Sequence, residues 1–247
     1  VLKIFRSVMT DKLGYIVPNI RVTDNPQLEA DKVKIFINGM SVSEFQMTPD
    51  EAGVRVFSEN LTNIFIKHAD EILYNRDVEM YLKLLKTENK NEYNYLIKHT
   101  CGVRRVLANL LTENISVKNI VKIAELIYYY SFEKYSADEI SELIRTDNSV
   151  KRYIQNTHTT NNEISAYELS AEMTEAVKTA SSYKQELEII EKIKQYLNPE
   201  ADNTIICGKS IRLKLFKIIS DVFPKTNIIA YTELLKTIKI KQKGLIT

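Results

Sequence analysis

Residues 103–126 read VRRVLANLLTENISVKNIVKIAEL, and their apolar pattern predicts the structure of the surrounding region. Its apolar residues recur at steps of three and four, which places them on one face of a helix: Val103, Val106, Leu107, Leu110 and Leu111 before the turn, and Ile120, Ile123, Ala124 and Ile127 after it. Asn114 suits the left-handed position that ends a helix, and Ser116 is the candidate N-cap of the next one. The stretch therefore predicts two short amphipathic helices joined by a sharp turn.

The composition is that of an ordinary soluble globular protein, with 247 residues of which 44% are hydrophobic and 27% charged. A formal net charge of +2 is too small to demand a nucleic acid or a membrane surface as partner. No apolar run approaches the roughly 20 residues that a membrane helix needs. Cys101 and Cys207 are far apart in the sequence, which favours a reduced, cytosolic setting over a disulfide framework.

Upstream of this stretch, residues 1–56 predict a small N-terminal α/β subdomain, with a short helix over 3–13 that is closed by Gly14. Strands are expected at 16–22, 33–37 and 41–47. Thr48 is the candidate N-cap, and Pro49 the first residue, of a long helix that opens a helical subdomain over 57–154. Further helices are expected at 76–86, 91–99, 103–112, 117–131 and 136–147.

Downstream, the polar residues 155–163 predict a linker, and residues 164–247 predict a two-layer α/β subdomain. Strands are expected at 164–169, 204–207 and 227–230, and helices at 171–180, 183–197 and 210–223. Near the C-terminus, lysines alternate with isoleucines, which is typical of a solvated edge strand: Lys236, Ile238, Lys239, Ile240, Lys241 and Lys243. The predicted fold class is α+β with several subdomains, the central one all-helical.

The stretch at 103–126 resembles the motif of the FHIPEP family, the large export-gate subunit of flagellar and virulence type III secretion systems. The matching positions are Val106, Leu107, Leu110, Leu111, Glu113, Ile115, Ser116, Val117, Lys118, Asn119, Ile120, Ile123 and Glu125. Lys118-Asn119, where flagellar members usually carry Arg-Asp, is typical of the virulence (injectisome) branch. Further matches lie at positions 14–22 and 67–69 and at Arg145, Arg212, Phe223-Pro224 and Glu233.

The resemblance implies the cytosolic C-terminal domain of such an export gate, at the cytoplasmic face of the bacterial inner membrane. It also implies that a membrane-anchored N-terminal part is missing from this sequence. Family members form a nine-membered ring that receives secretion substrates, their chaperones, the gatekeeper and the ATPase stalk, and that passes substrates to the membrane channel. Because the central helical subdomain makes most subunit contacts in the family, its charged residues are the interface candidates: Arg104, Arg105, Glu113, Lys118 and Glu125.

The sequence departs from the family pattern at one place. The family carries an additional subdomain between the first sheet and the long helix, whereas only residues 48–56 separate Met47 from Phe57 here. Either this member lacks the insertion or the sequence shown has lost it. A partner site that the family builds beside the inserted subdomain is therefore in question.

We expect neither an enzyme nor a cofactor or metal site. Gly208-Lys209-Ser210 follows a strand and opens a helix, but Asn203 stands where a phosphate-binding loop requires its first glycine. A polar helix N-terminus capped by Ser210 is the favoured interpretation. The three histidines are isolated from one another, and His68 is expected to be a helix-packing residue: His68, His99 and His158.

Two alternatives to the export gate stay open: a helix–turn–helix nucleic-acid-binding protein and a non-enzymatic helical scaffold. The first draws on the basic residues of the helix pair, Arg104, Arg105, Lys118 and Lys122. Glu113 and Glu125 offset part of that charge, so we expect no nucleic acid as partner. A contiguous basic stripe would favour DNA, whereas acidic and basic faces on different sides of the helical subdomain would favour a ring.

Overall fold

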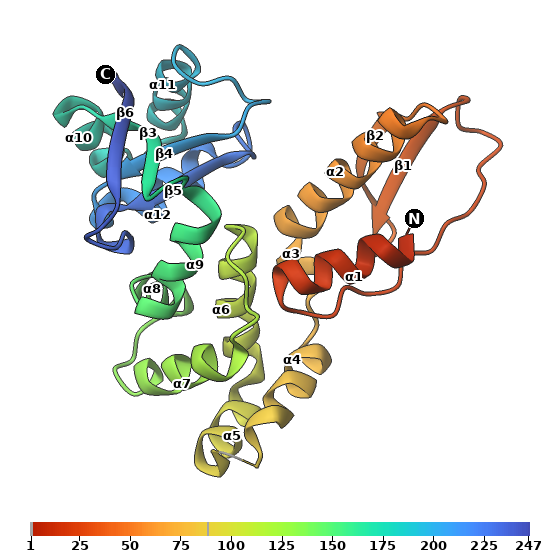
Figure 1. Ribbon diagram of the computed structural model, residues 1–247, viewed down its shortest axis with the longest axis horizontal. Helices are drawn as coiled ribbons and strands as arrows, with labels where there is room; N and C mark the ends of the chain where they lie inside the picture. Colours follow the sequence, from red (N-terminus) through yellow and green to blue (C-terminus); the bar gives the residue numbers. More distant parts are fainter. Residues whose placement is uncertain (1, 88) are drawn as a thin grey trace. The chain divides into compact units, whose positions relative to one another are not determined.

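The computed structural model describes residues 2–87 and 89–247 (Figure 1). The chain divides into two compact units, Val1–Ser141 and Glu142–Thr247. The division falls within helix α8 (Ala137–Arg145). The expected subdomain boundaries at residues 56 and 154 stay predictions.

The first unit begins with helix α1 (Leu2–Leu13) and the antiparallel pair β1 (Lys32–Ile37) and β2 (Met40–Gln46). The remainder of this unit is helical. Its elements are α2 (Glu51–Lys67), α3 (Ala69–Ile72), α4 (Asn75–Leu82), the 3-10 turn η1 (Lys83–Leu85), α5 (Lys90–Leu96), the 3-10 turn η2 (Ile97–His99), α6 (Thr100–Thr112) and α7 (Ile120–Ser131). The predicted small sheet followed by a helical region is therefore confirmed.

The structure confirms the pair of amphipathic helices, α6 and α7, because all nine predicted apolar residues are buried. Asn114 has the predicted positive φ, at 56°. The prediction for Ser116 is wrong, since α7 begins only at Ile120 and the Ser116 hydroxyl accepts a bond from the Lys118 amide instead. The delay has a physical cause: Val117 is buried and its amide donates to the Leu13 carbonyl of α1 at 2.8 Å, which holds this segment out of the helix.

The strand predicted at 16–22 is absent, although the structure describes all of these residues. Side chains, rather than a neighbouring strand, form the hydrogen bonds with the backbone there. The Arg6 guanidinium donates to the Val17 carbonyl at 2.9 and 3.2 Å, and the Thr10 hydroxyl accepts from the Val17 amide at 3.2 Å. Pro18 has no backbone N–H, so this segment offers few donors for hydrogen bonds to a neighbouring strand.

The first turn of α2 also differs from the prediction. The N-cap is Asp50 rather than Thr48, and its carboxylate accepts from the Gly53 amide at 2.8 Å. Thr48 supports this cap by donating its hydroxyl to Asp50 at 2.6 Å. The helix therefore starts at Glu51, two residues later than expected, with Pro49 outside it.

The second unit holds the C-terminal half of α8 and α9 (Asn148–His158), followed by alternating strands and helices. These are β3 (Glu163–Leu169), α10 (Ala171–Thr179), α11 (Tyr183–Lys194), β4 (Asn203–Cys207), α12 (Lys209–Ile219), β5 (Thr226–Ala230), the 3-10 turn η3 (Tyr231–Glu233) and β6 (Lys239–Ile246). Helix α9 runs four residues into the segment expected to be a linker. Ser210 lies inside α12 and Gly208 is the N-cap, so the predicted cap is wrong.

The four strands form one parallel sheet in the order β5-β4-β3-β6. Side chains of α10, α11 and α12 share a core with Ile205, Cys207 and Ile228 of the sheet, which confirms the two-layer arrangement. Strand β6 lies at one edge, and its lysines are exposed as predicted. Exposed lysines oppose pairing of that edge with another chain.

Candidate subunit interface

Two of the five predicted interface residues, Arg104 and Lys118, bond to groups of the first unit that lie far away in the sequence. Arg104 on α6 donates from Nη1 to the carbonyls of Asp70 and Leu73, at 2.7 and 3.3 Å. Leu73 is the C-cap of α3, so its carbonyl lies at the end of the helix where a positive charge is favourable. Lys118 forms an ion pair with Asp11 of α1.

The other three candidates differ in exposure. Glu113 is half-buried and forms the C-cap of α6. Glu125 is exposed on α7 and accepts from Lys122 one turn earlier, with 3.1 Å between Nζ and Oε2. Arg105 is exposed, and its guanidinium makes no hydrogen bond or ion pair in the part of the chain that the structure describes. The structure therefore leaves Arg105 and Glu125 as the candidates best placed to meet another subunit.

The same contacts bear on the nucleic-acid alternative. Of the four basic residues on the helix pair, Arg104, Lys118 and Lys122 are engaged with groups of the first unit. A phosphate-binding surface needs cations that are free to replace counterions. Within the described ranges, Arg105 is the one residue of these four that is free to bind a phosphate. A single cation is too few for a DNA contact.

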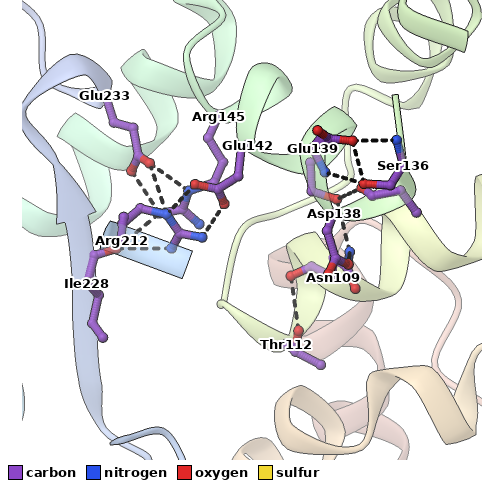
Figure 2. Close-up of polar contacts among 12 residues, drawn as sticks. Asn109, Thr112, Ser136, Asp138, Glu139, Glu142, Arg145, Arg212, Ile228 and Glu233 are labelled. Carbon is purple, nitrogen blue, oxygen red and sulfur yellow. Dashed lines mark hydrogen bonds and ion pairs between the residues drawn. The ribbon is translucent and has the colours of Figure 1, made fainter. Parts of the chain in front are cut away.

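The second unit contains a feature that the sequence analysis did not predict: a buried ionic cluster of Glu142, Arg145, Arg212 and Glu233 (Figure 2). Arg145 donates from Nε and Nη2 to the two carboxylate oxygens of Glu233, at 2.9 and 2.8 Å. Arg212 makes the same two-pronged contact with Glu142 and lies 3.5 Å from Glu233. Both guanidinium groups also donate to the carbonyl of Ile228 on β5.

This cluster is deeply buried and electrically balanced. Arg212 is 0% exposed, Glu233 1% and Arg145 3%. Two arginines face two glutamates, so the cluster contributes no net charge to the interior. Three of its members match the family motif, but Glu142 was missed, because nothing in the local pattern separates it from the exposed Glu139 of the same helix.

Cys207 lies close to this cluster, and burial raises the pKa of its thiol to about 12. Only the thiolate is a good nucleophile, so Cys207 is expected to be inert in the folded protein, whereas Cys101 is exposed. A colorimetric thiol reagent at pH 8 should therefore react with one equivalent of thiol in the native chain and with two in 6 M guanidinium chloride. In the Cys101→Ser variant the native reaction should disappear. Two fast thiols in the native protein would contradict the burial of Cys207.

Among the described residues, no group of three or more His, Cys, Asp or Glu side chains is arranged to hold a metal ion. His68 terminates α2, is half-buried, and has its Nδ1 atom 2.7 Å from Glu71. His99 packs its ring on Tyr95, with 4.5 Å between the centroids. Within the same residues, no helix combines the length and the apolar character needed to cross a bilayer.

Comparison with known proteins identifies the family to which this architecture belongs. The model of the FHIPEP family matches residues 51–239, which include the α6–α7 pair and the buried ionic cluster. The chain belongs to the FHIPEP family. The resemblance seen at 103–126 is thereby confirmed.

One sequence relative and two solved structures agree with this assignment. The alignment with the flagellar biosynthesis protein FlhA of Buchnera aphidicola extends over 305 residues at 18% identity. It covers 99% of this chain and 44% of FlhA. This chain therefore spans under half the length of that relative. Among solved structures, the Shigella flexneri MxiA protein has a TM-score of 0.86 at 18% identity. The match covers 99% of this chain and 92% of the MxiA chain. Nonameric SctV-C from EPEC has a TM-score of 0.79 at 13% identity, with coverage of 99% and 92%.

Proposed function

We propose that this chain is the cytosolic domain of a type III secretion export gate of the injectisome branch, and that it works as a ring at the cytoplasmic face of the inner membrane. The family match over residues 51–239 is the observation that carries the proposal. The nonameric assembly of SctV-C, which shares the fold, supports a ring of nine copies. The role is non-enzymatic: the ring receives secretion substrates, chaperones, the gatekeeper and the ATPase stalk, and passes substrates to the channel.

A ring requires a head-to-tail contact in which two different patches of the same chain meet. Arg105 and Glu125 suit such a contact, because both are exposed on the α6–α7 pair and carry opposite charges. Arg104 and Lys118 are less suited to it, since Arg104 binds the carbonyls of Asp70 and Leu73 and Lys118 is paired with Asp11 of α1, whereas the partner of Glu125, Lys122, lies on the same helix. Attachment to a membrane would raise the effective concentration of the subunits, so the isolated domain is expected to associate weakly.

The test is sedimentation velocity of the purified chain over a wide range of concentration. We expect a closed species of nine subunits to grow at the expense of the monomer. Arg105→Glu should shift this transition to at least about tenfold higher concentration. Lys184→Glu, an exposed cation on α11, serves as the matched charge reversal and should leave the transition unchanged. A wild-type chain that stays monomeric throughout would contradict the ring, and retention on DNA at low salt without self-association would favour the nucleic-acid alternative.

A further inference from the structure

The division between the two compact units falls inside a helix rather than in a linker. Boundaries of this kind normally lie in exposed segments rich in glycine, proline and polar residues, which let the two parts move independently. Helix α8 contains neither glycine nor proline, and only Thr146 and Asp147 separate it from α9. The units therefore share α8: residues 137–141 belong to the first unit and residues 142–145 to the second.

The first half of α8 is anchored to α6 by one side chain, Asn109. The Nδ2 atom of Asn109 donates to Oδ1 of Asp138 at 2.9 Å and to Oγ of Ser141 at 3.2 Å (Figure 2). Ser141 is 3% exposed, and its hydroxyl in turn donates to the carbonyl of Ala137 at 2.7 Å. Residues 132–136, which lead into α8, are all exposed, so side-chain contacts, and not the connecting segment, hold this half in place.

The second half of α8 is anchored by the buried ionic cluster. Glu142 and Arg145 are the two members of the cluster that lie on α8, and they pair with Arg212 of α12 and Glu233 of η3. Both pairs are two-pronged, which fixes the direction of each side chain as well as its distance. Because the cluster is buried, neither pair can be broken without leaving a charge that water does not compensate.

Neither half of α8 is long enough to be stable by itself. The whole helix has nine residues, whereas isolated helices shorter than about 12–15 residues are marginal in water. At its start, the Ser136 amide donates to Oε2 of Glu139 at 2.8 Å and the Ser136 hydroxyl accepts from the Glu139 amide at 3.3 Å. Ile140 and Ile144, on opposite sides of the division, are both buried. Helix formation is cooperative, so the loss of either anchor is expected to open α8 on both sides of the division.

We propose that α8 is a coupling element whose two halves form and open together, so that a change at the buried ionic cluster is transmitted to Asn109 on α6, and the reverse. Helix α8 is then the two-state element that both anchors bias, and the coupling has the same magnitude in either direction. A partner that stabilises or disturbs the cluster thereby changes a contact of α6 that it does not touch. This inference uses only contacts within the chain and does not depend on the proposed function.

The first test is amide hydrogen exchange of the full chain carrying Glu142→Gln, measured residue by residue by NMR. The substitution keeps the shape of the side chain and removes the charge that Arg212 binds. The amide of Ile140, which belongs to the first unit, donates to the Ser136 carbonyl at 2.9 Å and exchanges only when that bond opens. We expect its exchange to become at least about tenfold faster, although Ile140 touches no member of the cluster through a polar group.

The second test reverses the direction. Asn109→Ala removes the first anchor, and exchange at the amide of Ile144, in the second unit, should again become at least about tenfold faster. Two matched controls make the same chemical changes at exposed positions: Glu188→Gln on α11 and Asn94→Ala on α5. Neither control should change the exchange of any amide in α8.

The pattern along α8 decides the outcome. Faster exchange confined to residues 142–145 in Glu142→Gln, and to residues 137–141 in Asn109→Ala, would overturn the coupling and leave the two anchors as local contacts. The amides of Ile205 and Ile229 in the sheet show whether the second unit stays folded in Glu142→Gln. If those amides lose protection as well, Asn109→Ala decides alone, because it changes no residue of the second unit.

Discussion

Replacement of Glu233 by glutamine should lower the free energy of unfolding of residues 142–247 by about 3–5 kcal/mol. Glu233 is the partner of Arg145 and also lies 3.5 Å from Arg212, so its neutralisation leaves buried positive charge without compensation. Urea unfolding of the full chain, followed by circular dichroism and by the exposure of the Cys207 thiol, measures the effect. Glu200→Gln is the matched control: Glu200 pairs with Lys225 at 3.8 Å but is 87% exposed, and its loss should cost less than about 0.5 kcal/mol.

The paired replacement Arg145→Met with Glu233→Leu distinguishes charge from packing. It removes one cation and one anion together and leaves Arg212 bonded to Glu142. Breaking a buried pair costs more than replacing both members by apolar groups, so the double variant should be more stable than Glu233→Gln. Equal losses in the two variants would show that shape, rather than charge balance, holds this region together.

The second large effect is expected for Gly14→Ala, at the end of α1. Gly14 has a φ of +81°, and an added Cβ atom would lie 2.1 Å from the backbone nitrogen of Lys118. The left-handed backbone costs a non-glycine residue about 1–3 kcal/mol, and the clash with a backbone that has no freedom to move aside adds a similar amount. We therefore expect a loss of about 4 kcal/mol in the stability of the first unit, measured by urea unfolding.

Gly39→Ala provides the matched comparison, because Gly39 has nearly the same φ of +84° but no atom lies within 4 Å of an added Cβ. This variant should lose only the conformational part, about 1–3 kcal/mol. The difference between the two variants isolates the close approach of α1 to the segment before α7. If both variants lost the same amount, the close packing at Gly14 would have no energetic weight.

The features that the sequence predicted well depend on neighbours close in the chain. The apolar residues at 103–127 repeat with the helical period, so their burial in α6 and α7 follows from the pattern alone. The same holds for the lysines of β6 and for the left-handed Asn114. In each case the residues within one or two turns carry all the information that the prediction needs.

The features that were missed depend on partners far away in the chain. Arg104 resembled a free surface charge, because the carbonyls of Asp70 and Leu73 that it binds lie more than thirty residues earlier. The strand expected at 16–22 failed because side chains from α1 satisfy its backbone. The two hydrogen-bonded pairs of the buried ionic cluster join residues separated by 70 and 88 positions, and the family motif marked three of the four residues without showing that they meet.

The contact between the end of α1 and the segment before α7 also has a consequence for the order of folding. It joins the Leu13 carbonyl to the Val117 amide, and Asp11 to Lys118, which is 107 positions later. Closing so long a loop costs conformational entropy before any contact repays it, whereas α6 and α7 each form from local interactions. The segment between α6 and α7 is therefore expected to reach its native geometry late in folding. It does so after both helices have formed, when α1 packs against it.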